Sequence, residues 1–296
     1  MRVKINILLA VLIAAGFIMM VAGYAMGGYR TMYFDRTGLR FSERRSSGGN
    51  AAGSGLMVSV SEKSLAKIES ISVNLVDTDV FIIPADFNGI EMRYDENRVI
   101  EWELRNGTLT VSDKTNSSRL IFFGFSFPFD STPREYIYIY CDAPSLRDVS
   151  FSSVSGDFNS DWIGAVNVSL NTVSGDIDIK NLRVSDRLMI ETVSGDIFVG
   201  EGSAERAETS TVSGNMKLER FGAFDFKFVT ISGDLRAGFD FAANKSDVRI
   251  TTLSGDVTLD GARFRNRSDY GGLRSVGAQY KIELDSVSGD FDLRFK

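Results

Sequence analysis

The sequence predicts an all-β fold class: a parallel β-solenoid (β-helix) with about 20 residues per coil, preceded by one N-terminal transmembrane helix. Three observations lead to this prediction. A tetrapeptide of the form Val-Ser-Gly-Asp recurs through the second half of the chain, short runs of alternating apolar and polar residues fill most of the rest, and an uncharged run of 25 residues precedes them. Alternation with a period of two is typical of strands, and a fixed period near 20 residues is typical of stacked coils.

Residues 1–29 are predicted to be a membrane anchor. Residues 5–29 contain no charge, and about 20 apolar residues are enough to cross the hydrocarbon layer. A cleaved signal peptide is the alternative, because the small residues Gly23 and Ala25 could form a cleavage site. We expect a single-pass protein of the cell membrane with an extracytoplasmic body, although the five arginines at positions 30–45 alone favour the opposite orientation.

Residues 30–55 are predicted to be a basic stalk and a Ser/Gly linker, since the stretch SSGGNAAGSG has the composition of a flexible chain. Residues 56–150 are predicted to form irregular β coils and a cap, because strand-like runs such as SISVNLV and EYIYIY are separated by turn residues. Within them, residues 120–129 carry five phenylalanines in the run LIFFGFSFPF. This run is expected either to cover the open apolar end of the solenoid or to enter a membrane or partner.

Residues 151–296 are predicted to be the regular part of the solenoid. The tetrapeptide or a close variant begins at Val154, Val173, Val193, Val212, Ile231, Leu253 and Val287. One unit cannot bury its own apolar face, so neighbouring units must stack, with equivalent residues about 4.8 Å apart. Alternating residues before the tetrapeptides are expected to line the interior, namely Leu170, Ile190, Phe228, Ile250 and Leu284. The bend at each tetrapeptide is assigned to its glycine, which tolerates a positive φ angle.

The aspartates of the tetrapeptides are expected to stack into an acidic row. They are Asp157, Asp176, Asp196, Asp234, Asp256 and Asp290, with Asn215 at the equivalent place in one unit. Adjacent carboxylates repel each other, so the row must reach solvent, pair with cations or hold metal ions, for which calcium is the natural candidate. The alternative is that each aspartate caps its own turn through the backbone. No other cofactor is expected.

The apolar residue that opens each tetrapeptide has two alternative placements. Under strict alternation it falls on the face opposite the interior, where the set would form an exposed stripe suited to a partner. If the strand bulges at this point, the same residues turn inward instead. The sequence favours burial and leaves the exposed stripe as the alternative.

The interval before the last tetrapeptide is longer than the others, and residues 260–281 hold the extra length. They contain a cluster of basic and aromatic side chains that are the candidates for binding an anionic polymer: Arg263, Arg265, Arg267, Tyr270 and Arg274. The alternative is a solvated loop without a ligand.

The composition excludes several classes of function. The chain has no histidine and one cysteine, so it contains no His-based catalytic triad, no intrachain disulfide and no Cys/His zinc site. Its net charge is −6, and the part after residue 50 carries −11, which argues against binding nucleic acid. The carboxylates follow the repeat and do not converge as a pair, so a polysaccharide-acting β-helix enzyme is the least favoured function and no catalytic residue is assigned.

The motif [Thr/Ser]-Val-Ser-Gly-Asp, preceded by SVNLVDTDVFIIP, NGTLTV and EYIYIYCDAPSLRDVSFSSVSGDF, resembles the bacterial putative-adhesin family of β-strand-repeat domains over about residues 65–296. The resemblance implies a β-solenoid that is surface-exposed or membrane-tethered, in a family largely of unknown function, and it implies no catalytic residues. We therefore expect a membrane-anchored, non-enzymatic interaction or adhesin-like module that binds a surface polymer or an envelope protein. The alternative is a regulatory stress-response component of the envelope that signals to a membrane partner.

Overall fold

The computed structural model describes residues 31–35, 38–42, 57–96, 98–113, 135–142, 146–264, 275 and 277–296. The chain divides into two compact units. The first comprises Met1–Leu56 and Lys114–Pro133, and its described part is an antiparallel pair of strands, β1 (Thr31–Asp35) and β2 (Gly38–Ser42). The second comprises Met57–Asp113 and Arg134–Lys296 and holds the remaining described strands.

Several predicted segments fall outside this range. The membrane segment at residues 5–29, the Ser/Gly run of the linker and the phenylalanine-rich run at 120–129 all lie outside the described residues, so these three expectations stay predictions. Within the described residues, no helix has both the length and the apolar character needed to cross a membrane.

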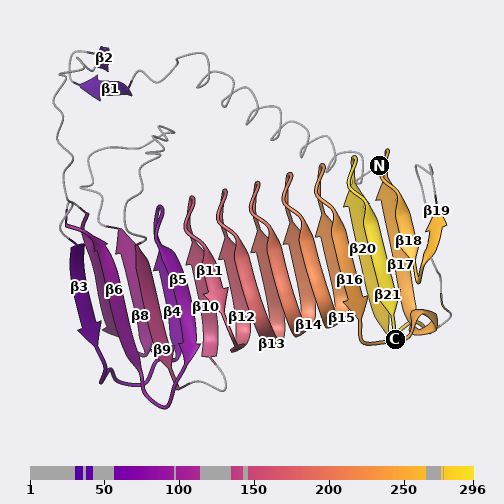
Figure 1. The fold of residues 1–296 in the computed structure, drawn as a ribbon, viewed down its shortest axis with the longest axis horizontal. Coiled ribbons are helices and arrows are strands. Elements are labelled where there is room, and N and C mark those ends of the chain that lie inside the picture. The colour runs from indigo at the N-terminus through magenta and orange to yellow at the C-terminus, as the bar shows by residue number, and fades with distance from the viewer. Residues whose placement is uncertain are drawn as a thin grey trace. The chain divides into compact units, whose positions relative to one another are not determined.

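The regular part of the second unit is a stack of parallel coils. Its strands are β10 (Leu146–Ser152), β11 (Phe158–Ser160), β12 (Ile163–Asn171), β13 (Ile177–Glu191), β14 (Ile197–Ser210), β15 (Met216–Val229) and β16 (Leu235–Phe239). Equivalent residues of the repeat face each other, because Ile177 is in register with Ile197 and Ile197 with Met216. Figure 1 shows these coils following one another along the solenoid.

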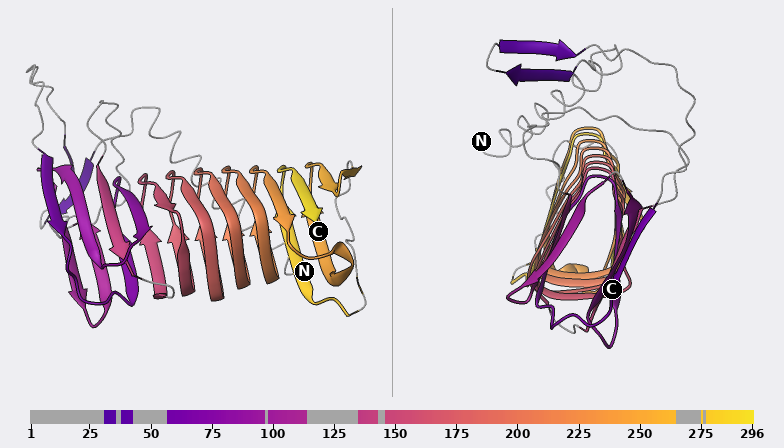
Figure 2. Two further views of the ribbon diagram at one scale, coloured as in Figure 1. Left: turned by 60° about the horizontal axis from the view of Figure 1, so that its bottom comes forward. Right: turned by 90° about the vertical axis from the view of Figure 1, so that its left-hand side faces the viewer.

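Each coil has two walls that meet at the tetrapeptide, as the end-on view in Figure 2 shows. We call the tetrapeptide the corner, the strand that leads into it the first wall and the strand that leaves it the second wall. At the corner of Val173, β12 ends the first wall at Asn171 and β13 begins the second wall at Ile177. β13 then continues to the next corner, and a register shift between Arg183 and Arg187 marks its return to the first wall.

The space between the walls is filled by apolar side chains. The five residues predicted to line the interior, Leu170, Ile190, Phe228, Ile250 and Leu284, are each 0% exposed, which confirms the prediction. Burying one such side chain contributes about 1.5–3 kcal/mol. Stacked coils therefore supply together the core that a single coil of this length lacks.

The coils at the C-terminal end do not follow chain order. Their strands are β17 (Ser246–Thr252), β18 (Val257–Leu259), β20 (Tyr280–Ser286) and β21 (Phe291–Phe295). β20 lies between β15 and β17, and β21 lies between β16 and β18. The corner of Val287 accordingly stands between those of Ile231 and Leu253: the N–H of Ser288 donates to the Ile231 carbonyl (2.8 Å), and that of Ser254 to the Val287 carbonyl (3.0 Å). The expectation that successive units stack in chain order is wrong at this end.

This order gives the reason for the long interval before Val287. After η1 (Ala243–Lys245), the chain forms the outer coil of β17 and β18 and adds the short antiparallel strand β19 (Ala262–Phe264). It must then return past that coil to reach the inner place, which β20 and β21 occupy. The extra residues of the interval span this return.

The N-terminal end of the second unit is also out of chain order. Its strands are β3 (Met57–Glu62), β4 (Ser70–Asn74), β5 (Asp79–Pro84), β6 (Gly89–Asp95), β7 (Ile100–Arg105), β8 (Thr108–Asp113) and β9 (Tyr136–Cys141). β4 and β5 pair in parallel with β10 and β11, and β8 and β9 lie on their outer side. Beyond these, β7, β6 and β3 pair antiparallel. Antiparallel strands therefore end the parallel stack on this side.

Candidate functional site

A buried hydroxyl fixes each corner. The residue before the corner valine is threonine or serine, and the Oγ1 of Thr172 accepts a hydrogen bond of 3.0 Å from the backbone N–H of Gly175. The same bond to the corner glycine recurs at Ser153, Thr192, Thr211, Thr230, Thr252 and Ser286. Because a short hydroxyl side chain bonded to a nearby backbone N–H stabilises a turn, the [Thr/Ser] position of the repeat specifies the bend.

The corner glycines are required by the close approach of neighbouring coils. A Cβ built on Gly195 would lie far closer than 3.0 Å to the carbonyl oxygen of Gly175 in the adjacent coil, a separation that real Cβ atoms essentially never show. The described glycines with a positive φ are Gly107, Gly261 and Gly277, and none of them is a corner glycine. The expectation of a positive φ at the corners is therefore wrong, and lack of space is the reason for glycine there.

The recurring aspartates form a hydrogen-bonded row beside the corners. Oδ1 of Asp157 accepts a bond of 2.8 Å from the backbone N–H of Asp176, and Oδ1 of Asp176 accepts one of 2.8 Å from Asp196. The bonded N–H belongs to the next coil, so the aspartates tie neighbouring coils together and do not cap their own turns. In spatial order the row runs through Asp79, Asp157, Asp176, Asp196, Asn215, Asp234, Asp290 and Asp256.

Asn215 shows that the row needs an acceptor oxygen and not a charge. Its Oδ1 accepts a hydrogen bond from the N–H of Asp234 at 3.1 Å, and its Nδ2 donates to Oδ1 of Asp196 at 3.3 Å. In the described part of the chain, no three His, Cys, Asp or Glu side chains gather as a metal ion would require. Calcium binding by the row stays a prediction.

The apolar corner residues form a ridge along the narrow edge of the solenoid. Val173, Val193 and Val212 are half-buried, whereas Val76 and Leu253, at the two ends of the ridge, are 44% and 73% exposed. Among the described residues, each inner member has a corner residue on both sides and each end member has one on a single side, which accounts for this difference. The side chains therefore point outward and shield one another, an arrangement between the two alternatives that the sequence offered.

Arg263 is the one described member of the predicted polymer-binding set. Its guanidinium pairs with Oδ2 of Asp256, the last aspartate of the row, so it is engaged within the chain. The other members, Arg265, Arg267, Tyr270 and Arg274, lie outside the described residues. Polymer binding by this set stays a prediction.

Outward-facing aromatic side chains gather at the N-terminal end of the second wall. β9 alternates strictly, with Ile137 and Ile139 buried at 0% exposure and half-buried tyrosines between them. We define the aromatic row as Phe81, Phe87, Tyr136, Tyr138 and Tyr140. Adjacent ring centroids lie 4.7 Å apart for Tyr136–Tyr138, 5.0 Å for Phe81–Tyr138, 6.4 Å for Tyr138–Tyr140 and 5.2 Å for Phe87–Tyr140. These spacings are those of aromatic rings in contact.

Polar groups border the aromatic row. The hydroxyl of Tyr140 donates to Oε2 of Glu91 at 3.5 Å. Burial, and after it the Glu91 carboxylate, raises the pKa of Tyr140, so its hydroxyl stays protonated and remains a donor. Parallel pairing of β5 with β9 sets Phe81 beside Tyr138. The row thus combines apolar ring surface with hydroxyl donors and a carboxylate acceptor.

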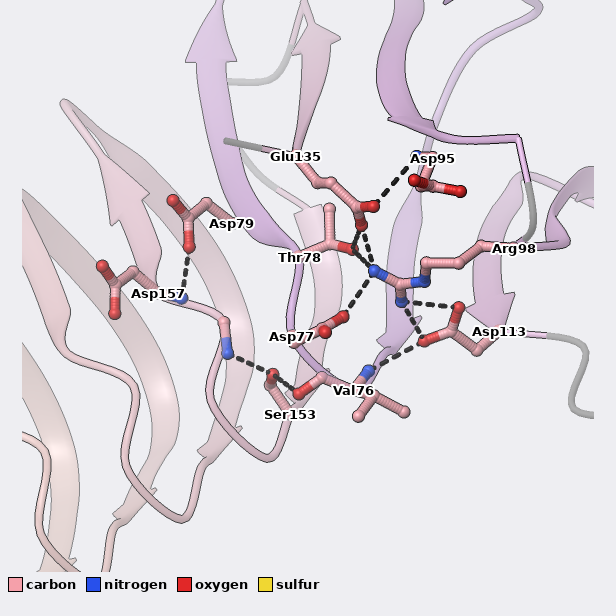
Figure 3. A network of polar contacts seen from close by, with 11 residues as sticks. Val76, Asp77, Thr78, Asp79, Asp95, Arg98, Asp113, Glu135, Ser153 and Asp157 are labelled. Atoms are coloured by element: carbon pink, nitrogen blue, oxygen red, sulfur yellow. Dashed lines mark hydrogen bonds and ion pairs between the residues drawn. The ribbon is translucent and has the colours of Figure 1, made fainter. Parts of the chain in front are cut away.

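An ion-pair network around Arg98 holds the strands of the aromatic row in place (Figure 3). The guanidinium pairs with Asp77, Asp113 and Glu135, at 2.8 Å in the case of Asp113. Burial lowers the pKa of Arg98, but these carboxylates raise it by more, so the pKa stays above its ordinary value. Asp113 ends β8 and Glu135 directly precedes β9, so one cation ties together the two ends between which residues 114–134 run.

Sequence reasoning named neither the aromatic row nor the Arg98 network as a site. A signal for the row was present, because the run EYIYIY places three tyrosines on one face of a strand. The phenylalanines come from a segment that the out-of-order pairing of β5 with β9 brings alongside. Nothing in the spacing of Arg98 from its carboxylates indicated the network.

Comparison with known proteins identifies related sequences and structures. A family model described as Toastrack DUF4097 matches residues 68–295, and no curated protein matches the chain. The chain is similar to a solved "putative adhesin" from Bacteroides fragilis NCTC 9343, at 14% identity over 81% of this chain and 97% of that chain, with a TM-score of 0.45. It is also similar to a "putative cell adhesion protein" from Clostridium sporogenes ATCC 15579 (12% identity, 81% and 100% covered, TM-score 0.36). A third similar structure is a "putative lipid binding protein" from Parabacteroides distasonis ATCC 8503 (15% identity, 82% and 98% covered, TM-score 0.42).

Proposed function

The chain belongs to the Toastrack DUF4097 family, and on that premise we propose that it is a non-enzymatic binding module of the cell surface. The aromatic row binds sugar rings of an extended surface polysaccharide, and the apolar segment at residues 5–29 holds the solenoid at the membrane. The observation that carries this proposal is the row itself: five rings that face outward and that the strands hold side by side.

The chemistry of the row fits a sugar ring. A hexose has a face of C–H groups surrounded by hydroxyls, and a tyrosine has an apolar ring face ending in a hydroxyl. Rings of this kind favour surfaces that are apolar in one part and wet in another. Because tyrosine has only two χ angles and the backbone is fixed in a sheet, little conformational entropy is lost on binding.

The linear arrangement of the row fits a polymer. One stacked sugar contributes little, but a chain that reaches several rings binds the second and later rings as an intramolecular event. The strand positions fix the spacing between Tyr136, Tyr138 and Tyr140, so the rings present a repeating surface. A repeating polymer uses every ring of such a surface, whereas a single small molecule would use one.

Binding without turnover is supported by the roles that the carboxylates already have. Cleavage of a glycosidic bond needs two carboxyl groups that flank one bond and act as acid and base. Near the row, Glu135 pairs with Arg98 and Glu91 accepts the hydroxyl of Tyr140. The aspartates of the corners bond to neighbouring coils. These carboxylates serve the fold.

The proposal is tested by retention of the full chain, purified in detergent, on insoluble polysaccharides such as cellulose, chitin and mannan. The double variant Phe81→Ser/Tyr138→Ser should bind the retained polysaccharide at least tenfold more weakly. Phe198→Ser is the matched control, because Phe198 lies in the same register row of the same wall but outside the aromatic row. Equal retention of the double variant and the wild type, or release of sugar by the wild type, contradicts the proposal.

Display at the cell surface has its own test. Protease added to intact cells should degrade the solenoid if residues 5–29 anchor it with the body outside. Complete protection of the solenoid in intact cells, with degradation after lysis, contradicts surface display.

A further inference from the structure

The first wall carries a second ordered surface, in its N-terminal half. Four adjacent parallel strands, β8, β4, β10 and β12, pair in register there. The outward positions of these strands hold small hydroxyl or amide side chains in nearly every case. We define the hydroxyl grid as Thr108, Thr110, Ser112, Ser70, Ser72, Asn74, Asp148, Ser150, Ser152, Asn167, Ser169 and Asn171.

The grid is regular in two directions. Register pairs Thr110 with Ser72, Ser72 with Ser150 and Ser150 with Ser169, so equivalent side chains repeat about 4.8 Å apart across the strands. Along one strand, alternate residues repeat about every 6.6 Å. Twelve side chains of types that donate or accept hydrogen bonds therefore form a lattice on one wall.

Charge separates the grid from the rest of the same wall. Asp148 is its single charged member, and it accepts a hydrogen bond from Nδ2 of Asn167 at 3.0 Å. The following strands of the wall carry instead Arg187, Met189, Glu191, Arg206, Glu208, Ser210, Asp225, Lys227, Val229, Lys281, Glu283 and Asp285 at the equivalent positions. Ion pairs join several of these, for example Arg187 with Glu208 at 3.1 Å. The grid therefore has one charged member in twelve, whereas nine of the twelve equivalent positions in the other half are charged.

Two grid atoms lack a hydrogen-bond partner. Among the described residues, the buried side-chain polar atoms without a partner are Oγ of Ser70 and Oδ1 of Asn171, and both belong to the grid. Ser70 is only 5% exposed. A buried polar atom that is left unpaired costs free energy. Because both atoms are buried, a ligand on this wall would contact the exposed grid members, such as Asn74 and Ser152, and not these two atoms directly.

We propose that the hydroxyl grid is a second binding site, for a chain of neutral sugars. Such a chain offers both donors and acceptors at every unit, as the grid does, and it carries no charge that would need a countercharge. A protein partner would bring aromatic and apolar residues to the centre of its interface, and the grid offers no apolar residue to receive them. This site lies on the wall opposite the aromatic row, so one molecule can hold two polysaccharide chains at once.

The proposal is tested in the full chain by removing the hydroxyls of one grid row with the triple variant Ser72→Ala/Ser150→Ala/Ser169→Ala. The control makes the same kind of change where the same register row continues into the charged half, as Met189→Ala/Glu208→Ala/Lys227→Ala. Retention is measured on cellulose, chitin and mannan, with acidic polygalacturonate as the charged comparison. Melting temperatures of both variants show whether the fold is kept.

The site predicts that the triple Ser→Ala variant binds at least one neutral polysaccharide tenfold or more weakly. The control and the aromatic-row variant Phe81→Ser/Tyr138→Ser should keep the binding that the grid provides. Unchanged retention of the triple Ser→Ala variant, retention on polygalacturonate alone, or no retention on any neutral polysaccharide overturns the proposal. The two sites can be told apart. Loss of retention only in the aromatic-row variant supports the proposed function and contradicts the grid. Loss of retention only in the grid variant supports the grid and contradicts the role of the aromatic row.

Discussion

Replacing Gly195 with alanine should lower the free energy of unfolding by about 3 kcal/mol. The new Cβ would overlap the carbonyl oxygen of Gly175, because it would lie well inside 3.0 Å. That oxygen belongs to the backbone of the adjacent coil, so it cannot move away by a rotamer change as the end of a flexible side chain could. Since non-bonded heavy atoms settle at about 3.5–4.0 Å, the two coils must move apart at this corner.

The magnitude follows from the hydrogen bonds that join these coils at the corner. The N–H of Ser194 donates to the Val173 carbonyl at 2.9 Å, and that of Ile177 to the Asp196 carbonyl at 2.9 Å. The N–H of Asp196 donates to Oδ1 of Asp176 at 2.8 Å. Each bond contributes about 0.5–1.5 kcal/mol, so losing all three removes about 1.5–4.5 kcal/mol, with about 3 kcal/mol at the centre of this range.

Thermal and urea unfolding, followed by circular dichroism, measure this change. In a unit of this size 1 kcal/mol corresponds to about 2–4 °C, so the melting temperature of Gly195→Ala should fall by about 6–12 °C. Ser194→Ala is the control at the same corner: its Oγ makes one exposed bond of 3.3 Å to the Val173 carbonyl, and its loss should cost less than about 0.5 kcal/mol. A loss below about 1 kcal/mol for Gly195→Ala would refute the claim that close approach is what requires glycine.

Three further outcomes follow from the same structure. Asp196→Ala leaves the N–H of Asn215 without its acceptor and should lower the free energy of unfolding in urea by about 1–3 kcal/mol. Asp196→Asn keeps an acceptor oxygen and should lower it by less than about 0.5 kcal/mol. Equal losses in the two variants would contradict the role of the row. Burial raises the pKa of Asp285 above 3.8, so its charge lowers stability at neutral pH. Asp285→Asn should therefore have a higher melting temperature at neutral pH, and this gain should shrink as the pH falls toward 3.8. A gain that persists below that pH would speak against burial of the charge as the cause. Burial raises the pKa of Cys141 to about 11, so its thiol should ignore Ellman's reagent in the native protein and react after denaturation; rapid native labelling would mean that β9 opens.

The sequence was informative wherever a residue type repeats with the coil. Alternation identified the interior residues Leu170, Ile190 and Phe228, because a period of two fixes which side of a strand a residue occupies. The pattern also contained the buried hydroxyl of Thr172, although its bond to Gly175 is visible only in the structure. Periodicity reports which residues are equivalent, and equivalence was enough to predict parallel stacking.

The reason for glycine at the corners could not be read from the sequence, because a positive φ and a lack of space require the same residue. Thr78 occupies the glycine position of the corner in the coil of β4 and β5, and its hydroxyl accepts a hydrogen bond from Arg98 at 2.9 Å and donates one to Glu135 at 3.2 Å. On its inner side, the missing Cβ of Gly156 faces the Thr78 carbonyl at less than 3.0 Å. At this end of the row the glycine position therefore holds a side chain that bonds to Arg98 and Glu135.

The order of the coils at the two ends and the two proposed surfaces could not be read either. All corners are alike, so nothing in the repeat says that the corner of Val287 stacks on that of Ile231. The pairing of β5 with β9, which completes the aromatic row, joins segments that no periodicity links. The hydroxyl grid draws its members from four strands, and its lattice exists only once their register is known.

The displaced coil at the C-terminal end has a consequence for the time course of synthesis. Val287 is made 34 residues after Leu253, yet it belongs nearer the middle of the stack. At about 5–20 residues per second, the ribosome delivers Leu253 roughly 2–7 s before the segment that must separate it from Ile231. During this delay the edge of the Ile231 coil has no native partner, and the Leu253 coil carries the same corner pattern, so a nascent chain can close early with one rung missing. A chain closed in this way must reopen at the Ile231 coil before β20 and β21 can take their places.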